Sequence, residues 1–303
     1  MNVAICSLGC AKNLVDSERI MAILKAQGYD FTADFESADI IIVNTCGFIA
    51  SAKEESIDAI IQYAKMKENR CCCLVVTGCM VKKYQQELEA EIPEVDLWLT
   101  SLNFETIGSR LQALFPEETA GIACCDHRRI LTTPSHWAYL KIAEGCDKRC
   151  SYCIIPKIRG RFRSVPMQEL LNEAKRLASE GVKELVLVAQ ETTLYGKDLT
   201  GEKQLPLLLH KLCKIEGIEW IRLLYCYPEE ITDELIKVIK TEEKVCNYID
   251  MPIQHSENRI LQRMGRRTSR EDLVAVIKKL RKEIPDITIR TTLITGFPGE
   301  SQE

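Results

Sequence analysis

Three cysteines crowd into one short stretch of the sequence, EGCDKRCSYCIIPKIRGRFR. Cys146, Cys150 and Cys153 have the spacing C-x3-C-x2-C and are called here the C-x3-C-x2-C trio. Thiolates this close together indicate a metal, but a zinc site normally closes with a fourth Cys or His. The histidines nearby in sequence, His127 and His136, do not have ligand spacing. Half of a zinc site and a C-x2-C redox pair remain alternatives. A cubane iron–sulfur cluster needs only three thiolates if its fourth iron takes a non-protein ligand.

A second set of three cysteines, the N-terminal trio, is spread over the first 80 residues. Cys10, Cys46 and Cys79 each follow an expected strand, and they are 36 and 33 residues apart, about one βα unit. Cysteines in this register meet beyond the carboxyl ends of neighbouring parallel strands, where open α/β sheets bind ligands. A glycine adjoins each cysteine and lets backbone approach a bulky inorganic group closely: Gly9, Gly47 and Gly78. The alternative is three buried core thiols.

Composition places the chain among ordinary globular proteins with one exception, its cysteine content. The 303 residues are 46% hydrophobic and 28% charged, with a net charge of −4, and they include 15 cysteines. The first residues lack the charged start of a signal peptide, and we expect no membrane-spanning segment. A reducing, cytoplasmic location is therefore expected, where clustered cysteines more often bind metal or catalyse than form disulfides.

Short apolar runs alternate with amphipathic stretches along the chain. The first series has expected strands at 3–6, 40–43, 74–76 and 97–99, and helices at 17–26, 51–65, 82–91 and 104–114. The second has strands at 138–142, 184–188, 220–224, 248–251 and 288–294, and helices at 167–179, 205–214, 232–241 and 270–282. Repeated βα units predict parallel sheets covered by helices. The expected division is a first domain over 1–118, a linker over 119–134 and a second domain over 135–303.

The C-x3-C-x2-C motif after the first strand of a βα series resembles the signature of radical S-adenosylmethionine enzymes. The resemblance implies a 4Fe–4S cluster whose open iron chelates the amino and carboxylate groups of S-adenosylmethionine. An electron from the cluster then cleaves the sulfonium to give a 5′-deoxyadenosyl radical. Two cysteine trios in this order resemble the methylthiotransferases more narrowly, over residues 2–300. That family implies a second 4Fe–4S cluster on the N-terminal trio, which carries the sulfur to be inserted.

Three further motifs, SLGCAKNLVDSE, CSYCIIPKIRGRFRS and QETTLYGKDL, resemble the RimO-type branch of the methylthiotransferases. Glu191 stands where this branch usually has aspartate. The branch implies methylthio insertion at the β-carbon of an aspartate in ribosomal protein S-twelve, free or on the small subunit. It implies an electron donor such as flavodoxin or ferredoxin, and no membrane partner. The alternatives are the transfer-RNA branch of the same family and a two-cluster electron carrier without transferase activity.

The resemblance also implies a fold and a set of cofactor contacts. The expected fold is an N-terminal flavodoxin-like parallel sheet followed by an open, partial TIM-type barrel. The segment TLITGFPGE resembles the G-x-I-x-G-x-x-E element beside the adenine, with Thr292 in place of its first glycine; the alternative is an ordinary strand-to-loop turn. The expected contacts to S-adenosylmethionine are Tyr152, Glu191, Gln254, His255, Ile294 and Gly296.

Basic residues alternate along KIRGRFR, at Lys157, Arg159, Arg161 and Arg163. In an extended segment they would share one face. Such a face is usually solvated, but near a barrel mouth it could hold an anionic partner such as ribosomal RNA. The remaining cysteines, including the runs at 71–73 and 124–125, are interpreted as non-ligands.

The sequence ends at Glu303, shortly after the fifth expected strand of the second series. The family resemblance implies another helix, a sixth strand and a small C-terminal β-barrel, called TRAM, that helps to hold the substrate. We therefore expect a truncated chain that assembles its clusters but modifies S-twelve poorly.

Overall fold

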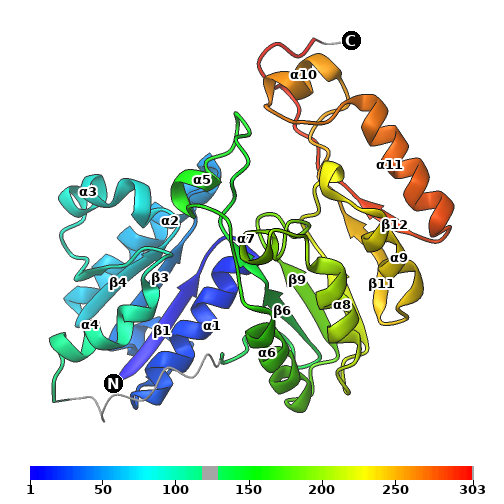
Figure 1. The fold of residues 1–303 in the computed structure, drawn as a ribbon. Helices are drawn as coiled ribbons and strands as arrows, with labels where there is room; N and C mark the ends of the chain where they lie inside the picture. Colours follow the sequence, from blue (N-terminus) through cyan, green and yellow to red (C-terminus); the bar gives the residue numbers. More distant parts are fainter. Residues whose placement is uncertain (118–128, 302–303) are drawn as a thin grey trace. The chain divides into compact units, whose positions relative to one another are not determined.

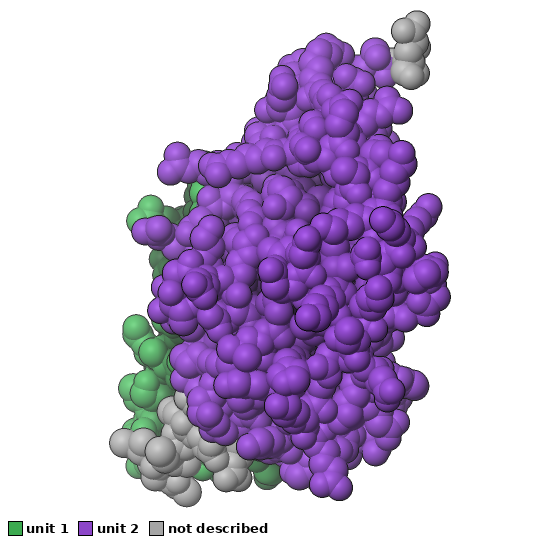
Figure 2. All heavy atoms as spheres, turned by 45° about the vertical axis from the view of Figure 1, so that its right-hand side comes forward, with its two compact units in different colours: residues 1–132, 157–159 green, residues 133–156, 160–303 purple. Residues whose placement is uncertain are grey.

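The computed structural model describes residues 1–117 and 129–301. Two compact units divide the chain: residues 1–132 with 157–159, and residues 133–156 with 160–303 (Figure 2). The three-residue segment Lys157–Arg159 thus belongs to the first unit, although its neighbours on both sides belong to the second. The cysteines expected to be non-ligands at 124 and 125 lie outside the described residues, as does His127.

A five-stranded parallel sheet forms the centre of the first unit (Figure 1). Its order is β2-β1-β3-β4-β5, the flavodoxin-like order, which confirms the expected fold. The strands are β1 (Asn2–Ser7), β2 (Asp30–Phe31), β3 (Ile40–Thr45), β4 (Cys73–Gly78) and β5 (Leu97–Trp98). The two-residue edge strand β2 was not expected, because so short a segment shows no alternation of apolar and polar residues.

Helices cover both faces of this sheet, which explains the uninterrupted apolar run of β3. Ile40 and Ile42 pack in one cluster with α1 (Ala11–Ala26) and α4 (Ile107–Leu114). Ile41 and Val43 pack in another with α2 (Ala50–Ala64) and α3 (Val81–Glu91). Successive side chains point to opposite faces of a strand, so a strand covered on both faces is apolar at every position. Each of these fully buried side chains stabilises the fold by about 2 kcal/mol.

Helix α1 begins at Ala11, six residues before the expected start. Its first turns bury polar residues, so no apolar stripe marks them in the sequence. The Asn13 amide donates to the carbonyl oxygens of Leu8, at 2.8 Å, and of Thr45, at 2.9 Å. The Ser17 hydroxyl donates to Ser7 Oγ at 2.8 Å. These bonds fasten the start of α1 to the ends of the strands beside it.

The second unit contains a five-stranded parallel sheet in the order β12-β11-β10-β9-β6. Spatial order follows chain order, as in part of a βα barrel, which confirms the expected fold class. The strands are β6 (Trp137–Lys141), β9 (Glu184–Val188), β10 (Trp220–Leu223), β11 (Val245–Asp250) and β12 (Thr288–Arg290). The helices after the first four strands are α6 (Met167–Ser179), α8 (Leu205–Cys213), α9 (Asp233–Thr241) and α11 (Arg270–Glu283) (Figure 1).

Strand β12 ends four residues earlier than expected. Beyond Arg290 only a single bridge, between Gln254 and Leu293, continues the pairing. Shorter elements complete the unit: α7 (Lys197–Thr200) and α10 (Asn258–Arg263). The 3-10 turns of the chain lie at Phe35–Ser37, Lys65–Glu68, Phe104–Thr106 and Pro228–Glu230. Across the described ranges 1–117 and 129–301, every helix is too short or too polar to cross a bilayer.

The segment KIRGRFR is not the extended basic face that its alternation predicted. Helix α5 (Ile155–Ile158) occupies its start, and β8 (Arg163–Ser164) pairs antiparallel with β7 (Ala143–Glu144) at its end. Arg159 is buried, whereas the Arg161 side chain is 89% exposed. The expectation of a shared face is therefore wrong, because a helical turn replaces the two-residue period of a strand.

We expect the change Gly78→Ala to destabilise the protein. Gly78 has φ +105°, and a Cβ there would lie 2.4 Å from the carbonyl oxygen of Thr45. Left-handed strain and the backbone clash together should lower the free energy of unfolding by at least about 2 kcal/mol. Gly181→Ala is the matched control: its φ is +98° and no atom lies within 4 Å, so strain alone should cost about 1 kcal/mol. Denaturant unfolding measures both, and equal losses would contradict the clash.

Candidate active site

The N-terminal trio lies where three adjacent parallel strands end. Strands β1, β3 and β4 are neighbours, and Thr45 of β3 pairs with Gly78 of β4. Cys46 directly follows the end of β3, and Cys79 directly follows the end of β4. Cys10 follows β1 and is the N-cap of α1. The structure therefore brings these three predicted site residues to one edge of the sheet.

Glycines let the three cysteine loops approach one another. A Cβ on Gly9, whose φ is +90°, would lie 2.6 Å from Cys46 Cβ and 2.9 Å from Cys46 Sγ. A Cβ on Gly47 would lie 3.1 Å from the Cα atom of Met80, the residue after Cys79. The sequence suggested room for an inorganic group, and the structure adds a second reason: larger residues would separate the thiols.

Burial raises the pKa of the Cys79 thiol to about 11, and the neighbouring Cys10 and Cys46 add to this effect. The guanidinium of Arg159 opposes it and lies against the sulfur, with Nε donating to Cys79 Sγ at 3.0 Å. Burial also raises the pKa of Cys46, with a further contribution from Cys10. Metal ligation requires thiolates, so loading of this trio releases protons and becomes more favourable as pH rises.

The C-x3-C-x2-C trio lies on the loop between β7 and α5 in the second unit. The Cys146 N–H donates to the carbonyl oxygen of Gly160 at 3.2 Å, and the Cys153 N–H to that of Cys150 at 3.0 Å. The Ser151 hydroxyl donates to the carbonyl oxygen of Arg263, at the end of α10, at 2.9 Å. A cavity of about 500 Å³ adjoins this loop and is lined by Cys146, Asp147, Arg149, Pro156, Gly160 and Arg161.

Burial raises the pKa of Cys146 to about 12, and Glu191 and the two other thiols of the trio contribute. No three Cys, His, Asp or Glu side chains within residues 1–117 and 129–301 are arranged around a single metal ion. A cluster distributes three thiolates over three different irons, so its ligands do not converge on one point. Three interacting thiols beside an open cavity fit such a cluster better than a zinc ion.

A network of partly buried charges supports the C-x3-C-x2-C loop and has no signature in the sequence. The Tyr227 hydroxyl lies 3.9 Å from Cys150 Sγ. The Arg266 guanidinium stacks 4.3 Å from the centre of the Tyr227 ring and pairs with Glu229 at 3.3 Å. Lys148 pairs with Glu230 at 2.6 Å. Tyr152, an expected cofactor contact, is partly buried, and burial raises its pKa, with a contribution from Cys150.

Glu191 is fully buried, and one of its oxygens accepts a hydrogen bond from the Thr193 hydroxyl. Its other oxygen, Oε2, has no hydrogen-bond partner in the described part of the chain. Burial raises the pKa of this carboxyl to about 8, although Thr193 and Lys148 oppose the shift. Glu191 is therefore mostly protonated at neutral pH.

The other expected cofactor contacts gather at the ends of β11 and β12. Gln254 has φ +70°, its N–H donates to the carbonyl oxygen of Thr292 at 2.9 Å, and its own carbonyl accepts from Ile294 at 2.8 Å. His255 Nε2 lies 3.1 Å from Glu300 Oε1. Nothing lies within 4 Å of a Cβ built on Gly296. The structure thus brings Gln254 and Ile294 together and leaves open space at Gly296.

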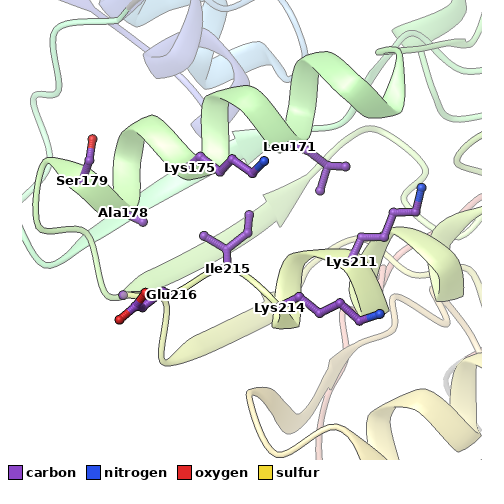
Figure 3. A pocket seen from close by; sticks show the side chains of 9 residues that line it. Leu171, Lys175, Ala178, Ser179, Lys211, Lys214, Ile215 and Glu216 are labelled. Carbon is purple, nitrogen blue, oxygen red and sulfur yellow. The ribbon is translucent and has the colours of Figure 1, made fainter.

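A separate groove of about 660 Å³ lies between α6 and α8 (Figure 3). It is lined by Leu171, Lys175, Ala178, Ser179, Lys211, Lys214, Ile215, Glu216 and Gly217. These residues come from the later parts of the two helices and from the segment before β10, whereas the cysteine loops follow strand ends. We therefore place this groove outside the reaction site, since βα barrels react at the carboxyl ends of their strands.

A parallel βα half-barrel with C-x3-C-x2-C after its first strand defines a class, the radical S-adenosylmethionine enzymes. Residues 140–303 match the family model described as the Radical SAM superfamily. Residues 2–100 match the model described as Uncharacterized protein family UPF0004. A solved structure of the radical S-adenosylmethionine methyltransferase TsrM from Kitasatospora setae is similar, with a TM-score of 0.71 at 14% identity over 99% of this chain and 68% of that chain. The enzyme OxsB is similar at a TM-score of 0.66 and 13% identity, over 97% of this chain and 49% of that chain.

Curated relatives are much closer in sequence. A protein of Lachnoclostridium phytofermentans named ribosomal protein uS12 methylthiotransferase RimO is 55% identical over 100% of this chain and 71% of its own length. Proteins of the same name from Alkaliphilus oremlandii and Clostridioides difficile are 51% and 49% identical and are covered over 69% and 70% of their length. This chain belongs to the RimO family of radical S-adenosylmethionine methylthiotransferases.

We expect the stability of the metal-free protein to depend on pH through Glu191. Its pKa rises from 4.5 to about 8 on folding, so between these values the folded state holds one extra proton. Stability must then fall as pH rises through this window, by about 1.4 kcal/mol per pH unit, or about 2 kcal/mol from about pH 6 to about pH 7.5. Glu191→Gln should remove this loss in urea unfolding, whereas Glu202→Gln, at an exposed position, should keep it. The same pH slope in all three proteins would show that Glu191 does not titrate in this range.

Proposed function

We propose that this chain inserts a methylthio group at the β-carbon of an aspartate in ribosomal protein uS12, the S-twelve of the sequence analysis. We further propose that each trio holds one 4Fe–4S cluster, an auxiliary cluster in the first unit and the S-adenosylmethionine-binding cluster in the second. The supporting observation is that the chain has two separate trios of cysteines, one where three neighbouring parallel strands end and the other on a single loop between β7 and α5. An electron carrier would need neither the open βα sheet nor the segment at Ile294 and Gly296.

When bound in the second unit, the cluster and S-adenosylmethionine would supply the chemistry for hydrogen abstraction from the substrate. The residues of this chain would bind and orient the reactants. Tyr152 adjoins Cys150 and would pack near the adenine, as would Ile294. The open space at Gly296 leaves room for close approach of the ligand to backbone. Gln254 and His255 would contact the rest of the nucleoside. Glu191, buried and protonated, has Oε2 available as a hydrogen-bonding atom.

The choice of uS12 over transfer RNA rests on the relatives and on the sequence motifs around Cys10, Cys153 and Glu191.

The proposed location is the reducing cytoplasm, where ribosomes and low-potential electron donors such as flavodoxin or ferredoxin are available. All 13 cysteines in the described part of the chain are free thiols, as such a location favours. The proposed domains are an auxiliary-cluster domain over 1–118, a linker over 119–134 and a radical core over 135–303.

Iron content tests the ligand assignment. After anaerobic reconstitution the protein should hold about eight irons, four for each of two clusters. Replacing all three residues of the C-x3-C-x2-C trio with alanine should leave about four, and so should the same replacement of the N-terminal trio. Cys72→Ala changes an exposed cysteine and should keep all of them. Retention of full iron content by either triple variant would refute the assignment of that trio.

Separate roles for the two trios can be tested with Cys46→Ala. This variant should lose sulfur insertion but still cleave S-adenosylmethionine in the presence of dithionite, because the other trio is intact. Loss of cleavage in folded Cys46→Ala would show that the trios do not act separately.

Mass spectrometry of uS12 and of transfer RNA, offered to the parent protein in one reaction mixture, identifies the substrate. A methylthio group on an aspartate of uS12 is expected; modification of transfer RNA alone would place the chain in the other branch.

A further inference from the structure

Arg159 is the one arginine of KIRGRFR that the structure removes from solvent. It is 1% exposed and ranks among the largest fully buried side chains of the described residues. It belongs to the first unit, within Lys157–Arg159, although its sequence neighbours belong to the second. A buried guanidinium is costly unless its donors are satisfied, so its partners indicate why it is there.

Three partners of Arg159 belong to the surroundings of the N-terminal trio. Nε donates to Cys79 Sγ at 3.0 Å, and Nη1 pairs with Asp16 Oδ2 at 2.8 Å. Nη2 donates to Asn13 Oδ1. The Asp16 side chain is only 4% exposed. Asn13 is itself fixed by bonds to the carbonyl oxygens of Leu8, two residues before Cys10, and Thr45, the residue before Cys46.

This geometry combines rigidity with charge. Asp16 and Asn13 each hold one terminal nitrogen of the planar guanidinium. This directs its remaining nitrogen, Nε, at the sulfur of Cys79. Hydrogen bonds and charges next to ligating sulfurs stabilise the thiolate and tune the reduction potential of a bound iron–sulfur cluster. Lys157 lies in the same segment, but its side chain is exposed.

We propose that Arg159 is a positioning residue for the N-terminal trio, which holds Cys79 as a ligand and stabilises the additional negative charge of a reduced cluster there. This inference rests on the proposed cluster of the N-terminal trio. It means that the segment after the C-x3-C-x2-C motif contributes a residue to the other trio. Because a cluster gains negative charge on one-electron reduction, loss of the guanidinium should make its reduction potential more negative.

The test uses the full chain with Cys146, Cys150 and Cys153 replaced by alanine, so that only the N-terminal trio binds iron. In this background Arg159→Gln should weaken iron retention against a chelator by about 10- to 100-fold. The cluster's potential, measured by redox titration with electron paramagnetic resonance, should fall by about 59 mV, a tenfold change in the ratio of reduced to oxidised cluster. Lys157→Gln removes the same charge from the same segment at an exposed position and should change neither quantity.

Two further variants keep the test decisive if Arg159→Gln does not fold. Arg159→Lys keeps the charge and should keep the potential near that of the parent, while retention falls because an ammonium lacks the planar fork. The double change Arg159→Gln with Asp16→Asn removes both charges of this buried ion pair together, and it should still lose iron retention. Unchanged retention and potential in the folded variants would overturn the role of Arg159. Absence of iron from the parent background would instead refute the proposed auxiliary cluster, which is a distinguishable failure.

Discussion

The parallel alignment of β1, β3 and β4 is the constraint on which the first unit's site depends. Three strands that run in one direction and lie side by side must end at one edge, and each ends one to three residues before a cysteine. Sheet hydrogen bonds fix the spacing of the ends, and helices packed on both faces hold the sheet rigid. The sheet therefore brings the three cysteines together before any ligand binds.

Concentrating thiols in a buried place creates an electrostatic cost that the surrounding structure partly offsets. Burial raises the pKa of Cys46, Cys79 and Cys146, so each would be a neutral thiol at neutral pH without a bound cation. In the first unit, the charge and the hydrogen bond of Arg159 oppose the rise in the pKa of Cys79. A positive group of this kind favours negative sulfur.

The second unit brings its three cysteines together in a different way. Its three thiols come from one loop, held between β7, β8 and α5, so their spacing is set by the chain itself. Tyr227, on which Arg266 stacks, contacts the loop at Cys150, and Ser151 bonds the loop to the end of α10. A short loop motif depends only on the chain around it, whereas the N-terminal trio requires three neighbouring parallel strands. This difference explains why one trio is compact in sequence and the other is dispersed over about 70 residues.

The sequence by itself determined the repeated βα pattern and the position of each trio cysteine after a strand, because apolar periodicity and cysteine spacing are local properties. The family and both fold classes came from the resemblance of its motifs to those of known enzymes. The sequence could not determine the early start of α1, whose polar residues Asn13 and Ser17 are buried against strand ends. It also misplaced Arg159 on a solvated face. Only the tertiary structure decided these points, because burial of a polar side chain depends on partners such as Asp16 and Cys79, which are 143 and 80 residues away along the chain.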